Sequence, residues 1–213
     1  MEGVSSLMRK EIWQYIKDLF GAPLRLLVLS DAAARRLRLT SLEDERIGAV
    51  LPYIKGRLLD IGAGNNRLVH EYKNGIGVDV FDWGGGVLIV EDTSHLPFED
   101  QSFDTITFLA SLNHIPYRKA VLREAYRVLK NDGQLLITMI NPLLGYLGHR
   151  LFWWYSEDKE RGMEAGEVYG LWTSEANRLC CNAGFELTSH SKFVYGLNNL
   201  YIVKKRSVVA KDA

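Results

Sequence analysis

The chain has 213 residues, of which 47% are hydrophobic, and its 26 basic side chains balance 26 acidic ones. That length suits a single α/β domain, and the zero net charge disfavours a dedicated nucleic-acid-binding protein, which normally carries a basic excess. The two cysteines, Cys180 and Cys181, are adjacent and have no cysteine or histidine partner at metal-ligand spacing. Neither a structural disulfide nor a metal site is therefore expected, and a reduced, cytoplasmic protein is the simplest interpretation.

The first amphipathic segment is residues 7–20, whose apolar side chains form one helical stripe: Met8, Ile12, Ile16, Leu19 and Phe20. We expect a helix that packs on the domain or covers its ligand. The alternative is a helix that lies in a membrane interface and gives the protein a peripheral membrane contact. No signal peptide is recognised, and the apolar run 24–29 is too short to span a bilayer.

Helix and strand patterns alternate along the rest of the chain. The capping box Thr40-Ser41-Leu42-Glu43 predicts a helix from about residue 41 to Pro52. Strands are predicted at 57–61, 75–79, 87–91, 104–110 and 134–140, and helices at 65–73 and 118–130. Thr173 is expected to cap a last helix that ends at Gly184, before two strands at 185–194 and 199–205.

The order of these elements predicts a parallel sheet with helices on both faces, because the strands are apolar on both sides. Only about seven residues, Val80 to Gly86, link the second strand to the third, whereas a parallel crossover usually needs a dozen or more. The helix expected there must be reduced to a turn or lost. The direct turn Gly196-Leu197-Asn198 makes the last two strands an antiparallel hairpin at a sheet edge.

A glycine-rich turn, Gly62-Ala63-Gly64-Asn65-Asn66, follows Asp60 at the end of the first strand. A dinucleotide fingerprint would place a third glycine where Arg67 stands, and no Gly-Lys-Ser/Thr of a phosphate-binding loop follows. Asp79 ends the second strand, and open α/β sheets bind ligands at the carboxyl ends of their strands. The turn is therefore the candidate ligand site.

This turn resembles motif I, Asp-x-Gly-x-Gly-x-Gly, of class I S-adenosylmethionine (SAM)-dependent methyltransferases, with Asn66 in place of the last glycine. Asparagine tolerates a positive φ better than most residues. Other segments resemble that family in the same order: Gly77-Val78-Asp79, 91–98, 102–106, 110–115, 122–130 and 133–137. The matches run from 57 to 140, about 40% of the chain.

The resemblance implies a Rossmann-like α/β fold, a seven-stranded mostly parallel sheet of order 3-2-1-4-5-7-6, and SAM as the cofactor. It also implies that Asp79 binds the ribose hydroxyls, that Asp92 meets the adenine amino group, and that Thr93 lies close to the ring. The predicted cofactor-binding residues are Asp60, Gly62, Ala63, Gly64, Asn66, Asp79, Val80, Asp92, Thr93, Ala110 and Ser111.

Residues 1–213 are predicted to form one methyltransferase domain. Its parts are an N-terminal helical cap (1–52), a SAM-binding core (53–140), an acceptor lid (141–172), and the last helix with the edge hairpin (173–206). Within or beside the lid the predicted substrate-binding residues are His149, Trp153, Trp154, Tyr155 and Trp172. The alternative for this aromatic cluster is plain core packing of a small lid.

His114 follows the fourth strand and is the candidate general base, if the acceptor must lose a proton. The alternative is a histidine that caps the next helix or packs against the cofactor. The expected function is methyl transfer from SAM to a small-molecule or lipid-like acceptor by in-line displacement. The alternatives are a protein or RNA methyltransferase and a non-catalytic SAM-binding regulatory protein.

Overall fold

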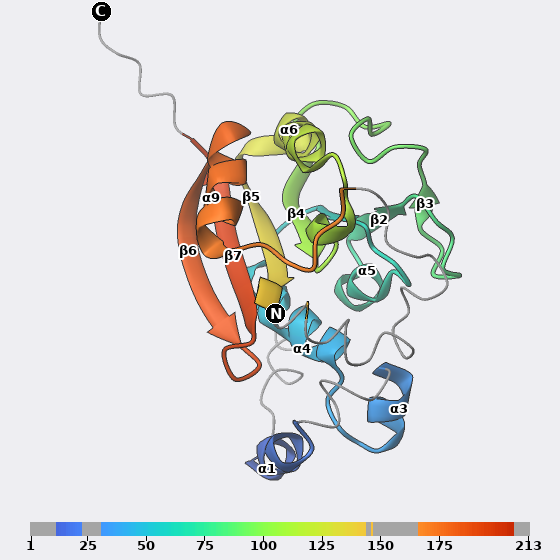
Figure 1. Cartoon of the computed structure of the whole chain (residues 1–213). Coiled ribbons are helices and arrows are strands. Elements are labelled where there is room, and N and C mark those ends of the chain that lie inside the picture. The colour runs from blue at the N-terminus through green and yellow to red at the C-terminus, as the bar shows by residue number, and fades with distance from the viewer. Residues whose placement is uncertain (1–11, 23–30, 144–145, 147–165, 207–213) are drawn as a thin grey trace, which may run out of the picture.

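The computed structural model describes residues 12–22, 31–143, 146 and 166–206 (Figure 1). Seven strands form one sheet of order β3-β2-β1-β4-β5-β7-β6, which confirms the predicted order. The strands are β1 (Leu58–Ile61), β2 (Gly75–Asp79), β3 (Leu88–Ile89), β4 (Phe103–Leu109), β5 (Leu129–Ile140), β6 (Phe185–Phe193) and β7 (Asn198–Lys205). The first five are parallel, whereas β7 is antiparallel to both β5 and β6.

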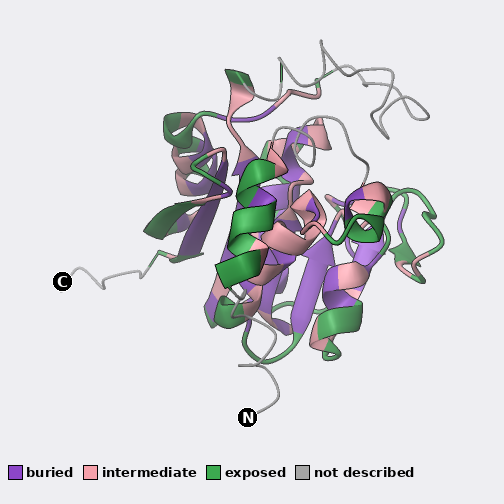
Figure 2. Ribbon diagram, turned by 90° about the horizontal axis from the view of Figure 1, so that it is seen from below, coloured by how far each residue is buried: buried purple, intermediate pink, exposed green. Residues whose placement is uncertain are grey.

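The α-helices and 3-10 helices of the described residues surround this sheet. They are α1 (Ile12–Phe20), α3 (Asp31–Arg36), α4 (Leu42–Val50), η1 (Leu51–Tyr53), α5 (Arg67–Tyr72), η2 (Leu112–His114), α6 (Arg118–Val128) and α9 (Thr173–Asn182). Figure 2 shows buried strands between layers of helices whose outer surfaces are exposed. Both faces of the sheet are therefore covered, as predicted.

Two apolar clusters hold the layers together, one on each face of the sheet. The first contains buried residues of α6 and α9, such as Val121 and Leu179, together with Leu59 of β1. The second contains buried residues of α4 and α5, such as Ile47 and Leu68, together with Leu58 of the same strand. Neighbouring residues of β1 thus point to opposite clusters, as the strand period of two requires.

The predicted capping box is shifted by one residue. Ser41, not Thr40, is the N-cap of α4: its Oγ accepts a hydrogen bond from Asp44 N at 3.1 Å, and the Asp44 carboxylate accepts one from Ser41 N at 3.3 Å. The Thr40 hydroxyl instead donates to Asp18 Oδ2 at 2.6 Å. The box uses Asp44 and not Glu43, because Asp44 is the third helical residue after the Ser41 cap.

Three other boundaries differ from the prediction. β3 has two residues instead of five, and no helix forms between Val80 and Val87, so the reduced link is confirmed. β5 begins directly after α6, because Leu129 already pairs with Phe103. Thr173 is the first residue of α9 and not its cap; its hydroxyl is bonded to the Tyr201 hydroxyl at 3.0 Å.

Candidate functional site

The glycine-rich turn leaves β1 at the carboxyl end of the parallel strands. Gly62 and Gly64 both have positive φ, +71° and +54°, which residues with a Cβ rarely adopt. A Cβ at Gly62 would lie 2.5 Å from Cβ of Ser111, whereas a Cβ at Gly64 would have no atom within 4 Å. The turn is thus closed toward β4 and open at its tip, where a ligand can approach the bare backbone.

Asp79 joins the end of β2 to this turn. Its Oδ2 accepts a hydrogen bond from Gly64 N at 2.9 Å, and its Oδ1 accepts one from Phe81 N at 3.1 Å. Each carboxylate oxygen has a second acceptor direction. The carboxylate is therefore fixed from both sides and still able to accept hydrogen bonds from two neighbouring hydroxyls.

Asn66 replaces the last glycine of the turn without changing its left-handed backbone, since its φ is 62°. The side chain is buried and lies over β2, where a Cβ on Gly77 would be 2.1 Å from Asn66 Oδ1. Asn66 Nδ2 donates to the Gly85 carbonyl at 3.2 Å. The glycine missing from the turn is thus compensated by Gly77 in the facing strand, and the amide ties the turn to the loop after β2.

That loop carries two aromatic side chains, Phe81 and Trp83, that were not among the predicted site residues. Phe81 and Trp83 are 52% and 38% exposed, and their ring centroids lie 4.8 Å apart. Gly85 packs so closely on the turn that a Cβ there would be 2.3 Å from backbone atoms of Asn65. The sequence signal that could have identified them is their spacing, two and four positions after Asp79 at the end of β2. They bring planar, exposed apolar surface next to Asp79.

Asp60 is buried at the carboxyl end of β1, with 1% of its surface exposed. Its Oδ1 accepts a hydrogen bond from the Thr107 hydroxyl at 2.6 Å. Burial raises the pKa of Asp60 to about 7; the Thr107 bond opposes this shift, and the negative charge of Asp79 adds to it. A carboxyl group in this state favours a nearby cation.

Asp92 and Thr93 follow β3. Asp92 Oδ1 accepts a hydrogen bond from Ser94 N at 2.8 Å, and the Ser94 hydroxyl donates to Oδ2. These bonds from Ser94 hold the pKa of Asp92 below its usual value. Thr93 is buried. Asp92 therefore organises the local turn, and its contact with an adenine group stays a prediction.

Ala110 and Ser111 occupy the end of β4 beside the turn. Ala110 has a φ of 58°, an uncommon value for a residue with a Cβ. Ser111 Oγ donates to the Ile61 carbonyl at 2.5 Å. This bond fastens the end of β4 to the end of β1, where Gly62 begins the turn.

His114 is the last residue of η2, directly after β4, and its side chain is 34% exposed. Its Nδ1 lies 3.3 Å from Oε2 of Glu167, whose side chain is 1% exposed. Arg118 helps to hold this geometry by donating to the carbonyls of Ile115 and Gly166, both at 3.0 Å. No sequence signal marks Glu167, which stands 53 positions after His114.

Of the predicted substrate-binding residues, Trp172 lies before α9 and is 55% exposed. His149, Trp153, Trp154 and Tyr155 lie outside the described residues. No group of histidine, cysteine, aspartate or glutamate side chains that could hold a metal ion occurs in the described part of the chain.

Taken together, the groups around the turn fit a nucleoside that carries a positive charge. Asp79 offers acceptors for a vicinal diol, Gly64 leaves room for close approach, and Phe81 with Trp83 offers a surface for a planar base. The buried Asp60 carboxyl group lies at the same edge, and a bound cation would favour its ionised form.

Residues 59–137 match the model of a family described as a methyltransferase domain. The ubiquinone/menaquinone biosynthesis C-methyltransferase UbiE of Bartonella tribocorum is 32% identical over 99 residues, which are 46% of this chain and 34% of that protein. The uncharacterized protein MJ1123 of Methanocaldococcus jannaschii is 33% identical over 139 residues, 62% of this chain and 65% of that protein. The chain thus spans about a third of the length of the UbiE relative.

Solved structures share the fold. A SAM-dependent methyltransferase from Thermotoga maritima has a TM-score of 0.60 at 24% identity, covering 77% of this chain and 89% of its own. The 1,6-didemethyltoxoflavin-N1-methyltransferase of Burkholderia thailandensis has a TM-score of 0.57 at 17% identity, covering 93% of this chain and 92% of its own. At these identities the likeness concerns the fold alone.

Proposed function

Residues 59–137 form a domain of the class I SAM-dependent methyltransferase family, and from this premise we propose that the protein transfers a methyl group from SAM to a small-molecule or lipid-like acceptor. The observation that carries the proposal is the arrangement of Asp60, Gly64 and Asp79 at one sheet edge.

SAM is the cofactor of this domain, and the residues that would hold it belong to four segments. Asp79 would accept the ribose hydroxyls, and the loop with Phe81 and Trp83 would cover the adenine from one side. Thr93 and Asp92 would lie at the adenine edge, as the family resemblance implies. Asp60, with Gly62 and Gly64, would face the charged methionine part.

When bound, SAM supplies a methyl group on a sulfonium, and the electron pair of the broken carbon–sulfur bond stays on sulfur. The chain must align the acceptor and exclude water. We propose that His114 Nε2 would take the proton from an acceptor O–H, N–H or acidic C–H. The electron pair of that bond would then stay on the acceptor atom and be available to the methyl group that SAM would supply. The Glu167 carboxylate lies 3.3 Å from Nδ1 and would stabilise the resulting imidazolium, which then returns its proton to water.

The acceptor class is inferred from the printed functions of relatives together with the exposed aromatic surface of this chain. UbiE acts in quinone biosynthesis by its name, and the Burkholderia enzyme acts on a toxoflavin precursor by its name. Trp172 and Tyr117, 55% and 73% exposed, stand close in sequence to Glu167 and His114. An aromatic or quinone-like ring suits such a rim better than a charged polymer does.

Calorimetric titration with SAM and with S-adenosylhomocysteine tests the cofactor part. We expect the native chain to bind both, and Asp79→Ala to lose the heat of binding because the ribose acceptors are removed. Asp132→Ala, a change of an exposed carboxylate in β5, is the matched control and should bind normally. Native protein that bound neither ligand would contradict the proposal.

Incubation with a metabolite and lipid extract and methyl-labelled SAM tests the transfer. A labelled product whose formation requires the native chain, identified by mass, is the expected result. Label found on protein or RNA would favour the polymer-modifying alternative. Binding of SAM with no product from any fraction would favour a regulatory SAM-binding protein.

A further inference from the structure

Helix α1 is attached to the domain by its polar side. Asp18 is 1% exposed, and its carboxylate accepts hydrogen bonds from Thr40 N at 2.9 Å and from the Thr40 hydroxyl at 2.6 Å. Gln14 Nε2 donates to Asp18 Oδ1 at 3.0 Å and to the Arg38 carbonyl at 3.1 Å. Gln14 and Asp18 are four positions apart and so lie on one face of the helix.

The opposite face of α1 is apolar and points outward. Its exposed residues are Ile12 (77%), Trp13 (71%), Tyr15 (58%), Ile16 (37%), Leu19 (57%) and Phe20 (84%). A helix on a globular protein normally buries its apolar stripe and exposes the polar one. The hydrogen bonds of Asp18 hold α1 in the reverse orientation, so the outward apolar face follows from specific contacts.

Exposed basic side chains lie on α1 and on the segment to which it is bonded. Within the described residues 12–22 and 31–40, the charged side chains classed as exposed are Lys17, Arg35, Arg36 and Arg38, and of these Arg35 is paired with Glu43 and Asp44. The acidic residues of the same ranges are turned inward, since Asp18 is buried and Asp31 is half-buried. The chain as a whole has zero net charge. Lys17 on α1, together with Arg36 and Arg38 on the segment bonded to it, is called the basic rim, and it belongs to a protein of zero net charge.

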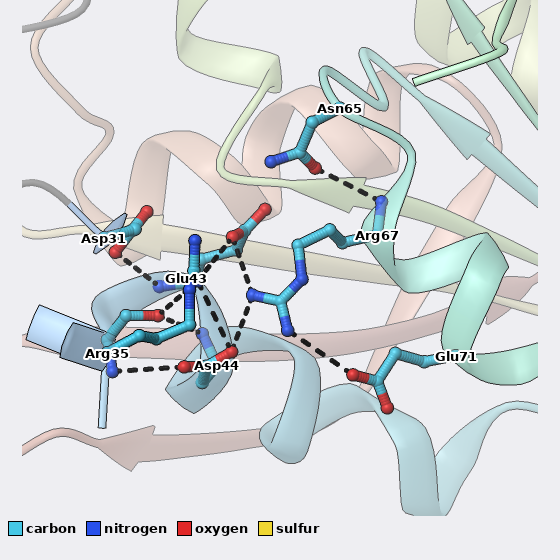
Figure 3. A network of polar contacts seen from close by, with 8 residues as sticks. Asp31, Arg35, Glu43, Asp44, Asn65, Arg67 and Glu71 are labelled. Atoms are coloured by element: carbon cyan, nitrogen blue, oxygen red, sulfur yellow. Dashed lines mark hydrogen bonds and ion pairs between the residues drawn. The ribbon is translucent and has the colours of Figure 1, made fainter. Parts of the chain in front are cut away.

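A chain of contacts connects α1 to the candidate cofactor turn. Thr40, bonded to Asp18, directly precedes the N-cap of α4. The first turn of α4 is in turn paired with Arg67 at the start of α5, just after the glycine-rich turn (Figure 3). In Figure 1, α1 and α3 lie beyond α4, toward the end of the sheet to which the β5 arrowhead points.

We propose that the outward face of α1, with its basic rim, docks on the surface of a bilayer that contains anionic phospholipid. Trp13 and Tyr15 are the residue types enriched at the boundary between hydrocarbon and water, and Lys17 with Arg36 and Arg38 would lie among the phosphate groups. No helix of the described residues is long and apolar enough to cross a membrane. The helix would therefore lie in the interface plane.

A second copy of the chain fits this face less well than a bilayer does. A two-fold contact through the apolar face would set two copies of α1 against each other, each with an exposed Lys17 and no exposed acidic side chain in the described residues 12–22. Anionic headgroups complement that charge, whereas an identical face repels it. The inference does not depend on methyl transfer, and its test uses no SAM.

Co-sedimentation of the full chain with lipid vesicles tests the proposal. We expect binding to vesicles of phosphatidylcholine mixed with phosphatidylglycerol and weaker binding to phosphatidylcholine alone. Ile16→Glu, at the centre of the face, should lower the partition coefficient roughly tenfold or more, because a charge replaces buried apolar surface. Replacement of Lys17 and Arg38 by Gln should lower it about fivefold per charge on the anionic vesicles.

Leu88→Glu is the matched control, because Leu88 is a similarly exposed aliphatic residue, 42% against 37% for Ile16, in another part of the molecule. It should bind vesicles as the native chain does, and circular dichroism should show that all variants fold. Native protein that stays in the supernatant with anionic vesicles would overturn the proposal. So would unchanged binding of Ile16→Glu, or light scattering that shows a dimer which Ile16→Glu dissociates, since a second copy would then occupy the face.

Discussion

Asp60 is a buried carboxyl group whose ionised form is disfavoured in the folded protein. Its carboxyl group is removed from water between β2 and β4, and only Thr107 among the described residues is seen to donate a hydrogen bond to its side chain. The ionised form is therefore disfavoured, and the pKa of Asp60 rises from 3.8 to about 7. The folded state keeps a proton that the unfolded chain has already released.

The raised pKa of Asp60 predicts a specific pH dependence of stability. Between about pH 4 and pH 7 the native state binds more protons than the unfolded state, so the free energy of unfolding falls as pH rises through this window. Asp60→Asn should remove this slope and gain at most about 4 kcal/mol over the native chain above pH 7. Urea unfolding at several pH values measures it, with Asp132→Asn as control. Equal slopes for native and Asp60→Asn proteins would refute the assignment.

His114 and Glu167 form a pair for which a catalytic role can be distinguished from a structural one. The buried carboxylate sits on Nδ1 of the imidazole, so Nε2 is the atom left for an acceptor. A purely structural contact and a catalytic one predict different results, because only the catalytic role requires the imidazole to change protonation during turnover.

Glu167→Gln should keep the fold, because the amide fills the same space, and should remove the negative charge that faces Nδ1 of His114. Circular dichroism checks that the variant folds. Once a product has been identified, kcat should fall by roughly ten- to a hundredfold with KM little changed. Glu175→Gln, in the first turn of α9, is the control. An unchanged kcat in Glu167→Gln would remove Glu167 from the mechanism.

At the scale of elements, Arg67 connects the N-terminal helices to the cofactor core. Its Nη1 lies 2.7 Å from Asp44 and 2.9 Å from Glu43 in α4, and its Nη2 lies 3.4 Å from Glu71 in α5 (Figure 3). The sequence marked Arg67 only as a residue that breaks the dinucleotide fingerprint. In the structure it joins α4 to the end of the glycine-rich turn.

Arg67→Met should therefore affect both stability and ligand binding. We expect the free energy of unfolding to fall by about 1 kcal/mol, since these pairs are partly exposed. The affinity for S-adenosylhomocysteine should fall several-fold, because α4 no longer fixes the start of α5. Arg35→Met is the control: it also removes a pair with Glu43, but touches only α3 and α4. Equal loss of affinity in both variants would contradict a specific link through Arg67.

Local patterns predicted most elements, and the exceptions have physical causes. The apolar patterns of these elements are clear because their side chains enter the apolar clusters: β1 and β4 contribute to both clusters, and β2 and α6 to the first. The orientation of α1 differs from the first expectation, which was that the helix packs on its apolar stripe. The stripe faces outward because Asp18 is hydrogen-bonded to Thr40, 22 positions away in the sequence. Glu167 and the role of Gly77 toward Asn66 likewise depend on tertiary contacts that no local pattern contains.

The whole molecule consists of a tightly packed sheet and a loosely attached N-terminal part. Two apolar clusters enclose β1, β4 and β5, whereas α1 exposes its apolar side chains and is hydrogen-bonded to Arg38 and Thr40 through Gln14 and Asp18. The cofactor turn lies between these parts. The free energy of local opening should therefore increase from α1 toward the sheet.

Native-state hydrogen exchange can measure this gradient across the whole chain. Amides of β1, β4 and β5 should exchange only with global unfolding, whereas those of α1 should exchange with a much smaller opening free energy, because few apolar contacts hold that helix. S-adenosylhomocysteine should slow exchange at 60–66 and 79–86, which lie around the site. It should leave residues 184–186, at the opposite edge of the sheet, unchanged as an internal control. Protection of α1 equal to that of β4, or a ligand effect confined to 184–186, would contradict this division of the molecule.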